Sequence, residues 1–170
     1  LCINPHAQHP ATPHRRLSAE QLVDELSVDG LYFSATGGGA TFGGGEPLLH
    51  ADFLAEFADK RPADWRVRVE TSLNADEAQL RRALDAVDGW IVDVKDLNPE
   101  IYRRYTGADN ARVLRNLRIL AENCPERVRI RLPRIPGFNT DGDRDASERA
   151  LREMGFSEIQ RFDYVDPARR

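Results

Sequence analysis

The sequence predicts an α/β fold in which helices cover a parallel sheet. Segments with helical and strand-like patterns alternate about five times along the chain, and this order is typical of a parallel sheet with right-handed crossovers. A length of 170 residues and a hydrophobic content of 41% suit one domain with a single core. Strictly alternating apolar residues mark the strands, and capping patterns mark several helix starts.

Composition excludes several classes of function. The net charge is −4 and the 31% of charged residues form no basic cluster, so no nucleic-acid partner is expected. No apolar run approaches the length of a membrane span, and no signal peptide is recognised, so no membrane partner is expected. Cys2 and Cys124 are too few and too distant for a disulfide framework, which favours a reducing, cytoplasmic setting. Cys124 is predicted to be a structural free thiol.

The first half of the chain contains a capped helix followed by two strand-like segments. Ser18, with Gln21 three residues later, forms a capping-box pattern that predicts a helix reaching residues 29–30. Residues 31–35 fit either an extension of this helix or a short strand. The pattern then predicts a strand at 40–42, a helix at 50–60 and an alternating strand at 66–70.

The second half repeats this alternation. Asn74 is the predicted N-cap of a helix, with Glu77 three residues later and Gly89 as its C-terminal cap. The elements predicted after it are a strand at 90–94, helices at 98–107 and 110–124, a strand at 127–132, a helix at 143–155 and a strand at 158–165. In such a sheet we expect function at the carboxyl ends of the strands.

Charged residues share one face of three predicted strands. Side chains alternate along a strand, so the apolar residues of each strand lie on the face opposite to the charged ones. The charged faces hold Arg66, Arg68 and Glu70 in the first strand, Asp93 and Lys95 in the second, and Arg129 and Arg131 in the third. Ions in a dry interior would cost several kcal/mol each, on the order of magnitude known for buried charges. Either water or a polar ligand therefore meets this face, and the position of the charges toward the carboxyl ends favours the ligand.

Six of the twelve glycines lie between residues 35 and 50, in two runs that flank residues 40–42. Glycine allows close approach to the backbone, so the runs predict a ligand against bare backbone, with a strand-end turn as the alternative. Neither run has the spacing of a phosphate-binding loop, and Glu46 follows Gly45 where such a loop would have Lys. A carboxylate suits a cation such as an ammonium group, and Pro47 favours extended geometry at Glu46.

The segment TGGGATFGGGEPLLHADFL at residues 36–54 closely resembles the signature of radical S-adenosylmethionine enzymes that activate glycyl radical enzymes. Three further segments resemble family motifs in the same order. The segment CINP at 2–5 resembles the end of the family's iron–sulfur motif. The segment IVDVKDLNPEIYRRYTGADNARVLRNL at 91–117 resembles the Asp-Leu-Lys strand and the segment after it. The segment IRLPRIPGFNTD at 130–141 resembles the Arg-bearing strand. The resemblance covers nearly the whole chain.

The resemblance implies a partial (β/α)6 radical SAM barrel, a curved parallel sheet with its helices outside. Five strands are visible in the sequence, so the first strand of the barrel would lie upstream of Cys2. Residues 1–170 would then be a radical SAM core domain that lacks this strand and most of the cluster loop. The start at Leu1, with no Met, fits this expectation.

The resemblance also implies roles for residues near the cluster and the glycine loop. Cys2 matches the third cysteine of the motif whose three thiolates hold a [4Fe–4S] cluster. Gly44, Gly45 and Glu46 match the loop that contacts the amino group of S-adenosylmethionine.

Further matches lie on the later strands. Asp93 and Lys95 match residues near the ribose and the methionine carboxylate of the cosubstrate. Arg131 matches a strand residue that lies along the adenosine, and Tyr164 falls where the family often has a histidine that touches the ribose.

Glu70 and Thr71 match an Asp-Thr pair that, together with the Asp93 strand, can help to place a monovalent cation. At this place the chain has ETSLN where the family has Asp-Thr-Asn-Gly.

The implied activity is reductive cleavage of S-adenosylmethionine and removal of a hydrogen from a glycine in a partner glycyl radical enzyme. A flavodoxin-like or ferredoxin-like protein would donate the electron. Two alternatives stay open, namely a radical SAM enzyme acting on a small molecule or peptide, and a non-catalytic relative without a cluster.

Overall fold

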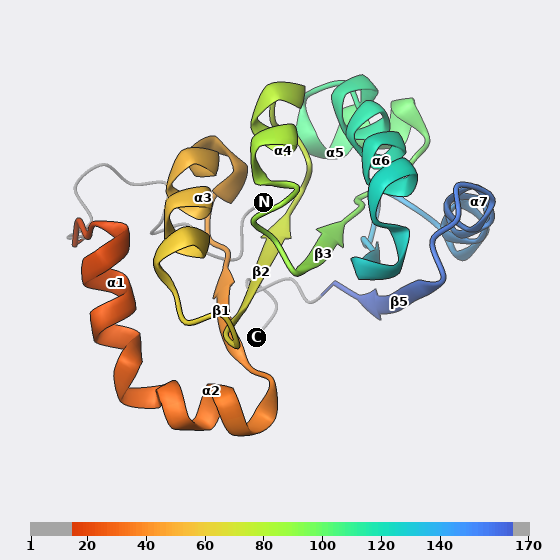
Figure 1. Ribbon diagram of the computed structural model, residues 1–170. Helices are drawn as coiled ribbons and strands as arrows, with labels where there is room; N and C mark the ends of the chain where they lie inside the picture. The colour runs from red at the N-terminus through yellow and green to blue at the C-terminus, as the bar shows by residue number, and fades with distance from the viewer. Residues whose placement is uncertain (1–14, 165–170) are drawn as a thin grey trace.

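Five parallel strands form one sheet in the computed structural model, which describes residues 15–164 (Figure 1). Each strand pairs with the next one along the chain, in the order β1-β2-β3-β4-β5. The strands are β1 (Gly39–Phe42), β2 (Arg66–Thr71), β3 (Gly89–Asp93), β4 (Val128–Arg134) and β5 (Glu158–Asp163). The predicted α/β fold with a parallel sheet is confirmed, and all five carboxyl ends lie at one edge of the sheet.

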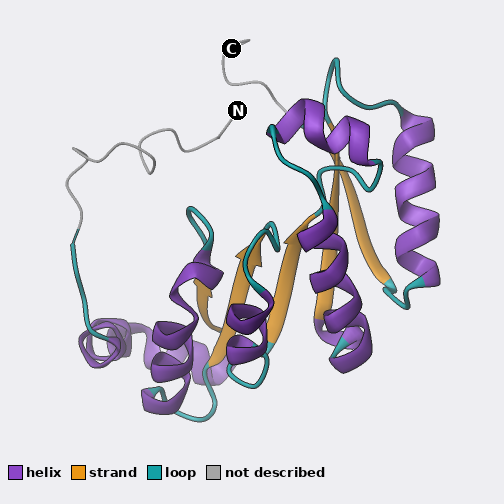
Figure 2. Cartoon of the chain, turned by 90° about the horizontal axis from the view of Figure 1, so that it is seen from above, coloured by secondary structure: helices purple, strands orange, loops and turns teal. Residues whose placement is uncertain are grey.

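Helices connect the strands and cover one face of the sheet. They are α1 (Ala19–Leu26), η2 (Ser27–Asp29), α2 (Gly30–Thr36), η3 (Pro47–His50), α3 (Ala51–Lys60), α4 (Glu77–Ala83), α5 (Pro99–Thr106), α6 (Ala111–Asn123), η4 (Pro125–Arg127) and α7 (Asp141–Glu153). Helices α3, α4 and α6 lie in a row on the same side of the strands (Figures 1 and 2). None of these helices is long and apolar enough to cross a membrane.

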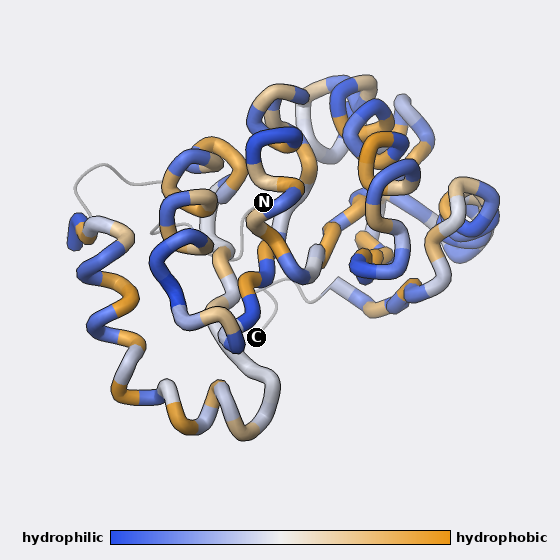
Figure 3. The backbone as a smooth tube through the Cα atoms, in the orientation of Figure 1, coloured by the Kyte–Doolittle hydropathy of each residue, from blue (hydrophilic) through white to orange (hydrophobic). Residues whose placement is uncertain are grey.

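The core lies between these helices and the apolar face of the sheet. Along β2 the hydropathy alternates from residue to residue (Figure 3), and the apolar members, Val67 and Val69, are fully buried. They share one hydrophobic cluster with Phe57 of α3, Leu80 of α4 and Leu117 of α6. The predicted division of the strands into an apolar and a charged face is therefore confirmed.

The sequence patterns predicted some helix ends correctly and others incorrectly. Ser18 and Gln21 form the predicted capping box, and residues 31–35 belong to α2 and not to a strand. Asn74 is not the N-cap of α4, because Asp76 occupies that position and forms a capping box with Gln79. Gly89 is not a helix cap either, because it begins β3 and pairs with β2 there.

Cys124 is buried and unpaired among residues 15–164, as predicted for a structural thiol. Burial is the largest influence on it and raises the pKa of its thiol. Cys2, the predicted cluster ligand, lies outside the described residues.

Candidate functional site

The carboxyl edge of the sheet gathers the predicted site residues from three neighbouring strands. Asp93 at the end of β3 pairs in register with Arg131 of β4. Glu70 lies near the end of β2, on the same face as these two side chains. The period of two along each strand thus places residues far apart in sequence on one surface.

Arg131 lies between two carboxylates. Its Nη1 donates a hydrogen bond to Glu70, and its Nε lies 3.1 Å from Oδ1 of Asp93. Lys95 approaches the other oxygen of Asp93 at 3.6 Å, and the ring of Phe162 lies 5.1 Å from the guanidinium carbon of Arg131. We call these five residues the Arg131 cluster.

The Arg131 cluster balances its own charge. Its four ionisable side chains are between 19% and 41% exposed, so water reaches each of them in part. Two cations face two anions within ion-pair distance. These charges are therefore neutralised without a ligand, and the choice between water and a polar ligand at this face depends on other features of the site.

One oxygen in the cluster still lacks a donor. Oδ1 of Asp93 is buried and receives no hydrogen bond from the described residues, because the nearby Nε of Arg131 is not aligned for one. An unsatisfied buried acceptor costs about 1–3 kcal/mol, so a ligand hydroxyl or amine that donates here would gain free energy. This atom is a point of fit for a polar ligand.

Glu46 is held at the end of β2 by four donors. Its Oε1 accepts from Thr71 Oγ1 at 2.5 Å and from the Leu48 amide at 3.3 Å. Its Oε2 accepts from the hydroxyl of Ser72 at 2.7 Å and from the Ser72 amide at 3.1 Å. A carboxylate has about four acceptor positions, so these bonds use them. The predicted extended backbone at Glu46 is present, with φ −113° and ψ 104°.

The loop after β2, which holds Glu46, is strained. Leu73 is fully buried at a φ of +59°, a conformation that costs a side chain other than glycine about 1–3 kcal/mol. Its amide donates to Thr71 Oγ1, and its carbonyl accepts from Asn116 Nδ2, which also donates to the Ala75 carbonyl. Sequence reasoning missed this role of Asn116, although an asparagine on the apolar face of a predicted helix was the available signal.

The two glycine runs have different causes. At Gly39 a Cβ atom would lie 2.0 Å from the carbonyl oxygen of Arg66, so this glycine is required for the close pairing of β1 with β2. Gly44 has a φ of +106°, and neither it nor Gly45 has any atom within 4 Å of a Cβ position. The first run is explained by the fold, whereas the second borders open space that a ligand could fill.

Two further predicted residues follow the strands. The amide of Tyr164 donates to the carbonyl of Arg134, while the hydroxyl of Tyr164 is buried with no hydrogen-bond partner in residues 15–164. Lys95 precedes Asp96, which accepts hydrogen bonds from Asn139 and Ser147 and ties the loop after β3 to the start and interior of α7.

Asp96 was not identified from the sequence. Asp96 as a whole is 3% exposed. Burial raises the pKa of its carboxyl group, although hydrogen bonds from the Asn98 amide, Asn139 and Ser147 oppose this rise. Its role depends on contacts with residues more than forty positions away, which no local pattern predicts.

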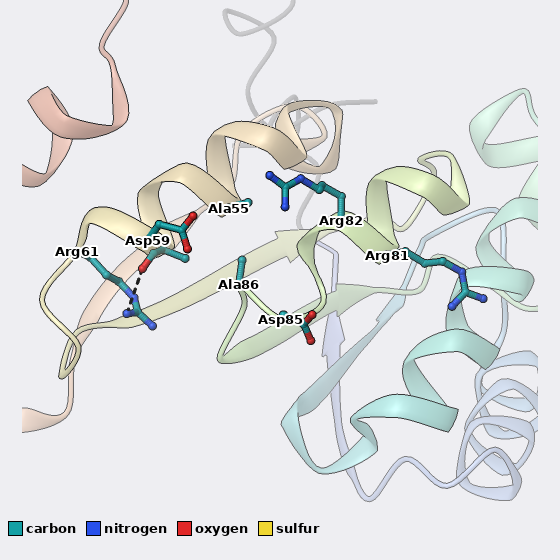
Figure 4. Close-up of a pocket in the computed structure, with 8 residues that line it drawn as sticks. Ala55, Asp59, Arg61, Arg81, Arg82, Asp85 and Ala86 are labelled. Carbon is teal, nitrogen blue, oxygen red and sulfur yellow. Dashed lines mark hydrogen bonds between the residues drawn. The ribbon is translucent and has the colours of Figure 1, made fainter.

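The charged face and the helical face each carry a hollow of about 330 Å³. The first borders Arg131 and is lined by Ile91, Arg129, Arg131, Gln160 and Phe162. The second lies between α3 and α4 (Figure 4), and none of the predicted site residues lines it. The hollow beside the Arg131 cluster is therefore the better candidate for ligand binding.

No group of three or more His, Cys, Asp or Glu residues in the described part of the chain is arranged to hold a metal ion. Any metal centre would need ligands such as Cys2 from outside residues 15–164.

Comparison with known proteins gives consistent matches. The family described as the Radical SAM superfamily matches residues 2–150. The indoleacetate decarboxylase activating enzyme of Tractidigestivibacter scatoligenes is 40% identical over 128 residues, which are 75% of this chain and 40% of that protein. The pyruvate formate-lyase-activating enzyme of Staphylococcus aureus (strain NCTC 8325 / PS 47) is 30% identical over 149 residues, which are 84% of this chain and 59% of that protein.

Structural comparison agrees. Streptococcus suis SuiB, solved bound to the precursor peptide SuiA, has a TM-score of 0.63 at 10% identity over 92% of this chain and 35% of that chain. At this identity the likeness concerns the fold alone. The chain spans about two fifths to three fifths of the length of these two curated relatives.

Proposed function

The chain belongs to the radical SAM superfamily, and on this premise we propose that residues 1–170 are the core domain of an enzyme that activates a glycyl radical enzyme. The proposed reaction cleaves S-adenosylmethionine reductively and removes a hydrogen atom from a glycine of the partner protein. The curated relatives that carry names of activating enzymes support this proposal.

One observation carries the proposal furthest: the donor-free Oδ1 of Asp93 lies on the same sheet edge as the open backbone at Gly44 and Gly45. S-adenosylmethionine has hydroxyl and ammonium groups that can donate to Asp93 Oδ1. Its positively charged amino end can lie against the open backbone at Gly44 and Gly45. The hydroxyl of Tyr164, which has no hydrogen-bond partner among residues 15–164, offers a further polar contact.

In this proposal the chain binds and orients the cosubstrate. Gly44 and Gly45 leave room for its amino group, and the charge of Glu46 favours that ammonium while its four hydrogen bonds hold the loop in place. Asp93 accepts from the ribose, and Lys95 attracts the carboxylate of the methionine end. Holding the reacting groups in one geometry lowers the entropic part of the barrier.

Cys2 would supply one thiolate to a [4Fe–4S] cluster. When bound, the cluster and S-adenosylmethionine supply the one-electron chemistry that removes the hydrogen atom. We propose a flavodoxin-like or ferredoxin-like electron donor and a cytoplasmic setting, in which thiolates stay reduced.

The test uses the full-length protein, reconstituted with iron and sulfide without oxygen and supplied with a reductant. We expect 5′-deoxyadenosine to form, and a glycyl radical to appear in the partner enzyme by electron paramagnetic resonance. A partner in which the target glycine is replaced by alanine is the control. Deoxyadenosine without a protein radical would instead favour a small-molecule or peptide substrate, and absence of S-adenosylmethionine binding would contradict the proposal.

A further inference from the structure

Glu70 and Asp93 present two carboxylates to the same space from neighbouring strands, and such a pair requires a counter-ion. The arrangement around them points to a protein side chain in that role. We infer that the guanidinium of Arg131 is the resident counter-ion, so that S-adenosylmethionine binds at this edge without a monovalent metal ion. The inference rests on the proposed function for the identity of the ligand.

Arg131 forms ion pairs with both carboxylates at once, and it donates a hydrogen bond to Glu70. Its Nη1 donates to Glu70 while its Nε lies 3.1 Å from Asp93 Oδ1, so the planar guanidinium spans the gap between β2 and β3. A guanidinium presents several donors in a rigid fork, and this suits two acceptors better than a single point charge does. The ring of Phe162, 5.1 Å from the guanidinium carbon, adds a cation–π contact.

The charge balance leaves no demand for a further cation. Arg131 and Lys95 carry two positive charges against the two negative charges of Glu70 and Asp93. A potassium or sodium ion between the carboxylates would have to displace the guanidinium of Arg131 or lie next to it, where the two positive charges repel each other. Either arrangement is electrostatically unfavourable.

Thr71, which the family resemblance associates with a cation, is engaged elsewhere. Its hydroxyl donates to Glu46 and accepts from the amide of Leu73, so it is engaged with the loops that follow β1 and β2. The described residues therefore do not fit the monovalent cation that the resemblance implies. The ETSLN segment at 70–74, where the chain departs from the family pattern, is the sequence counterpart of this difference.

The first experiment measures the dissociation constant of S-adenosylmethionine for the reconstituted full-length protein in potassium chloride and in choline chloride of equal ionic strength. We expect the two values to agree within about twofold, because no metal ion is linked to binding. Binding that is about tenfold or more weaker in choline would overturn the inference.

Two variants sharpen this comparison. Arg131→Met removes the guanidinium and leaves two carboxylates that attract a free cation, so its binding should become about tenfold tighter in potassium than in choline. Arg129→Met is the matched control, because Arg129 lies on the same strand and face but pairs with Glu158 instead. It should not respond to the choice of cation. An Arg131→Met protein that binds equally in both salts would contradict the assignment.

Thermal unfolding in the same two salts tests, without the cosubstrate, whether Arg131 or a metal ion is the counter-ion of the two carboxylates. The melting temperature of the wild type should be equal in both, whereas that of Arg131→Met should be higher in potassium. A wild type stabilised by potassium, at equal ionic strength, would overturn the inference. If S-adenosylmethionine binds in neither salt, the proposed function fails, and the melting comparison still identifies the counter-ion.

Discussion

On β2, Val67 and Val69 are fully buried under the helices, whereas Arg68 and Glu70, which alternate with them, face the other side and remain partly exposed. The same strand thus contributes to the core with one half of its residues and to the candidate site with the other half. A shift of pairing by one residue would exchange the two sets. The register is therefore specified by the apolar residues, and the charged face takes its position from them.

The two faces also differ in what they contribute to stability. Burial of a valine or isoleucine side chain stabilises a fold by about 1.5–3 kcal/mol, whereas partly exposed ion pairs contribute about 0–1 kcal/mol. The charged face is consequently a poor source of folding free energy. In the proposed function its residues bind the cosubstrate instead.

The largest expected effect compares two isoleucines on opposite faces. Ile130→Ala, on the apolar face of β4, should lower the free energy of unfolding by about 2–5 kcal/mol, because Ile130 is fully buried in the core. Ile91→Ala, on the charged face of β3, is the matched control and should cost less, since Ile91 is only partly buried. Denaturant unfolding measures both. Equal losses would contradict the division of the sheet into a core face and a partly exposed face.

The next prediction tests whether Glu46 contributes to cosubstrate binding, to stability or to both. Glu46→Gln should weaken S-adenosylmethionine binding and also lower stability by about 1–3 kcal/mol, because an amide nitrogen would face donors at Thr71 or Ser72. Calorimetric binding and denaturant unfolding measure the two losses.

Glu56→Gln, at an exposed position on α3, is the control for Glu46→Gln and should change neither quantity. Lost stability with unchanged binding in Glu46→Gln would restrict Glu46 to a structural role.

The pH dependence tests the buried carboxyl next to the charged face. Burial raises the pKa of Asp96 above its ordinary value of 3.8, so the folded state holds the proton more tightly than the unfolded state. The free energy of unfolding that Asp96 contributes should therefore fall as the pH rises from 3.8 through the raised pKa.

The measurement compares the wild type with Asp96→Asn by denaturant unfolding from about pH 3 to about pH 7, since groups common to both proteins cancel in the difference. The advantage of the wild type over the variant should shrink across this range. A constant difference would show that Asp96 does not titrate in it.

The smallest effect concerns the outer surface of the helices. Arg82 on α4 pairs with Asp52 on α3 at 3.0 Å, but the Asp52 side chain is 93% exposed. Arg82→Ala should lower the free energy of unfolding by about 1 kcal/mol or less, and added salt should reduce even this loss. A larger loss would mean that the hollow between α3 and α4 depends on this ion pair.

Local patterns predicted the elements well and their ends less well. Alternation identified the strand at 66–70, and the capping box at Ser18 was confirmed. Asn74 was chosen as a cap although Asp76 has the same chemistry two residues later. Residues 72–75 instead form the strained loop that Asn116 holds. Asn74 and Asp76 both satisfy the local rule for a helix N-cap. The choice between them depends on α6, whose Asn116 holds the loop that contains residue 74.

Sequence alone determined the α/β class, the number of strands seen in residues 15–164 and the face on which each charged residue lies. These follow from periodicity, which is a property of neighbouring residues. Tertiary structure alone decided that Arg131 bridges Glu70 and Asp93 and that Ser72 holds Glu46. These contacts join residues 26 to 61 positions apart, and only the register of paired strands brings such residues within hydrogen-bond distance.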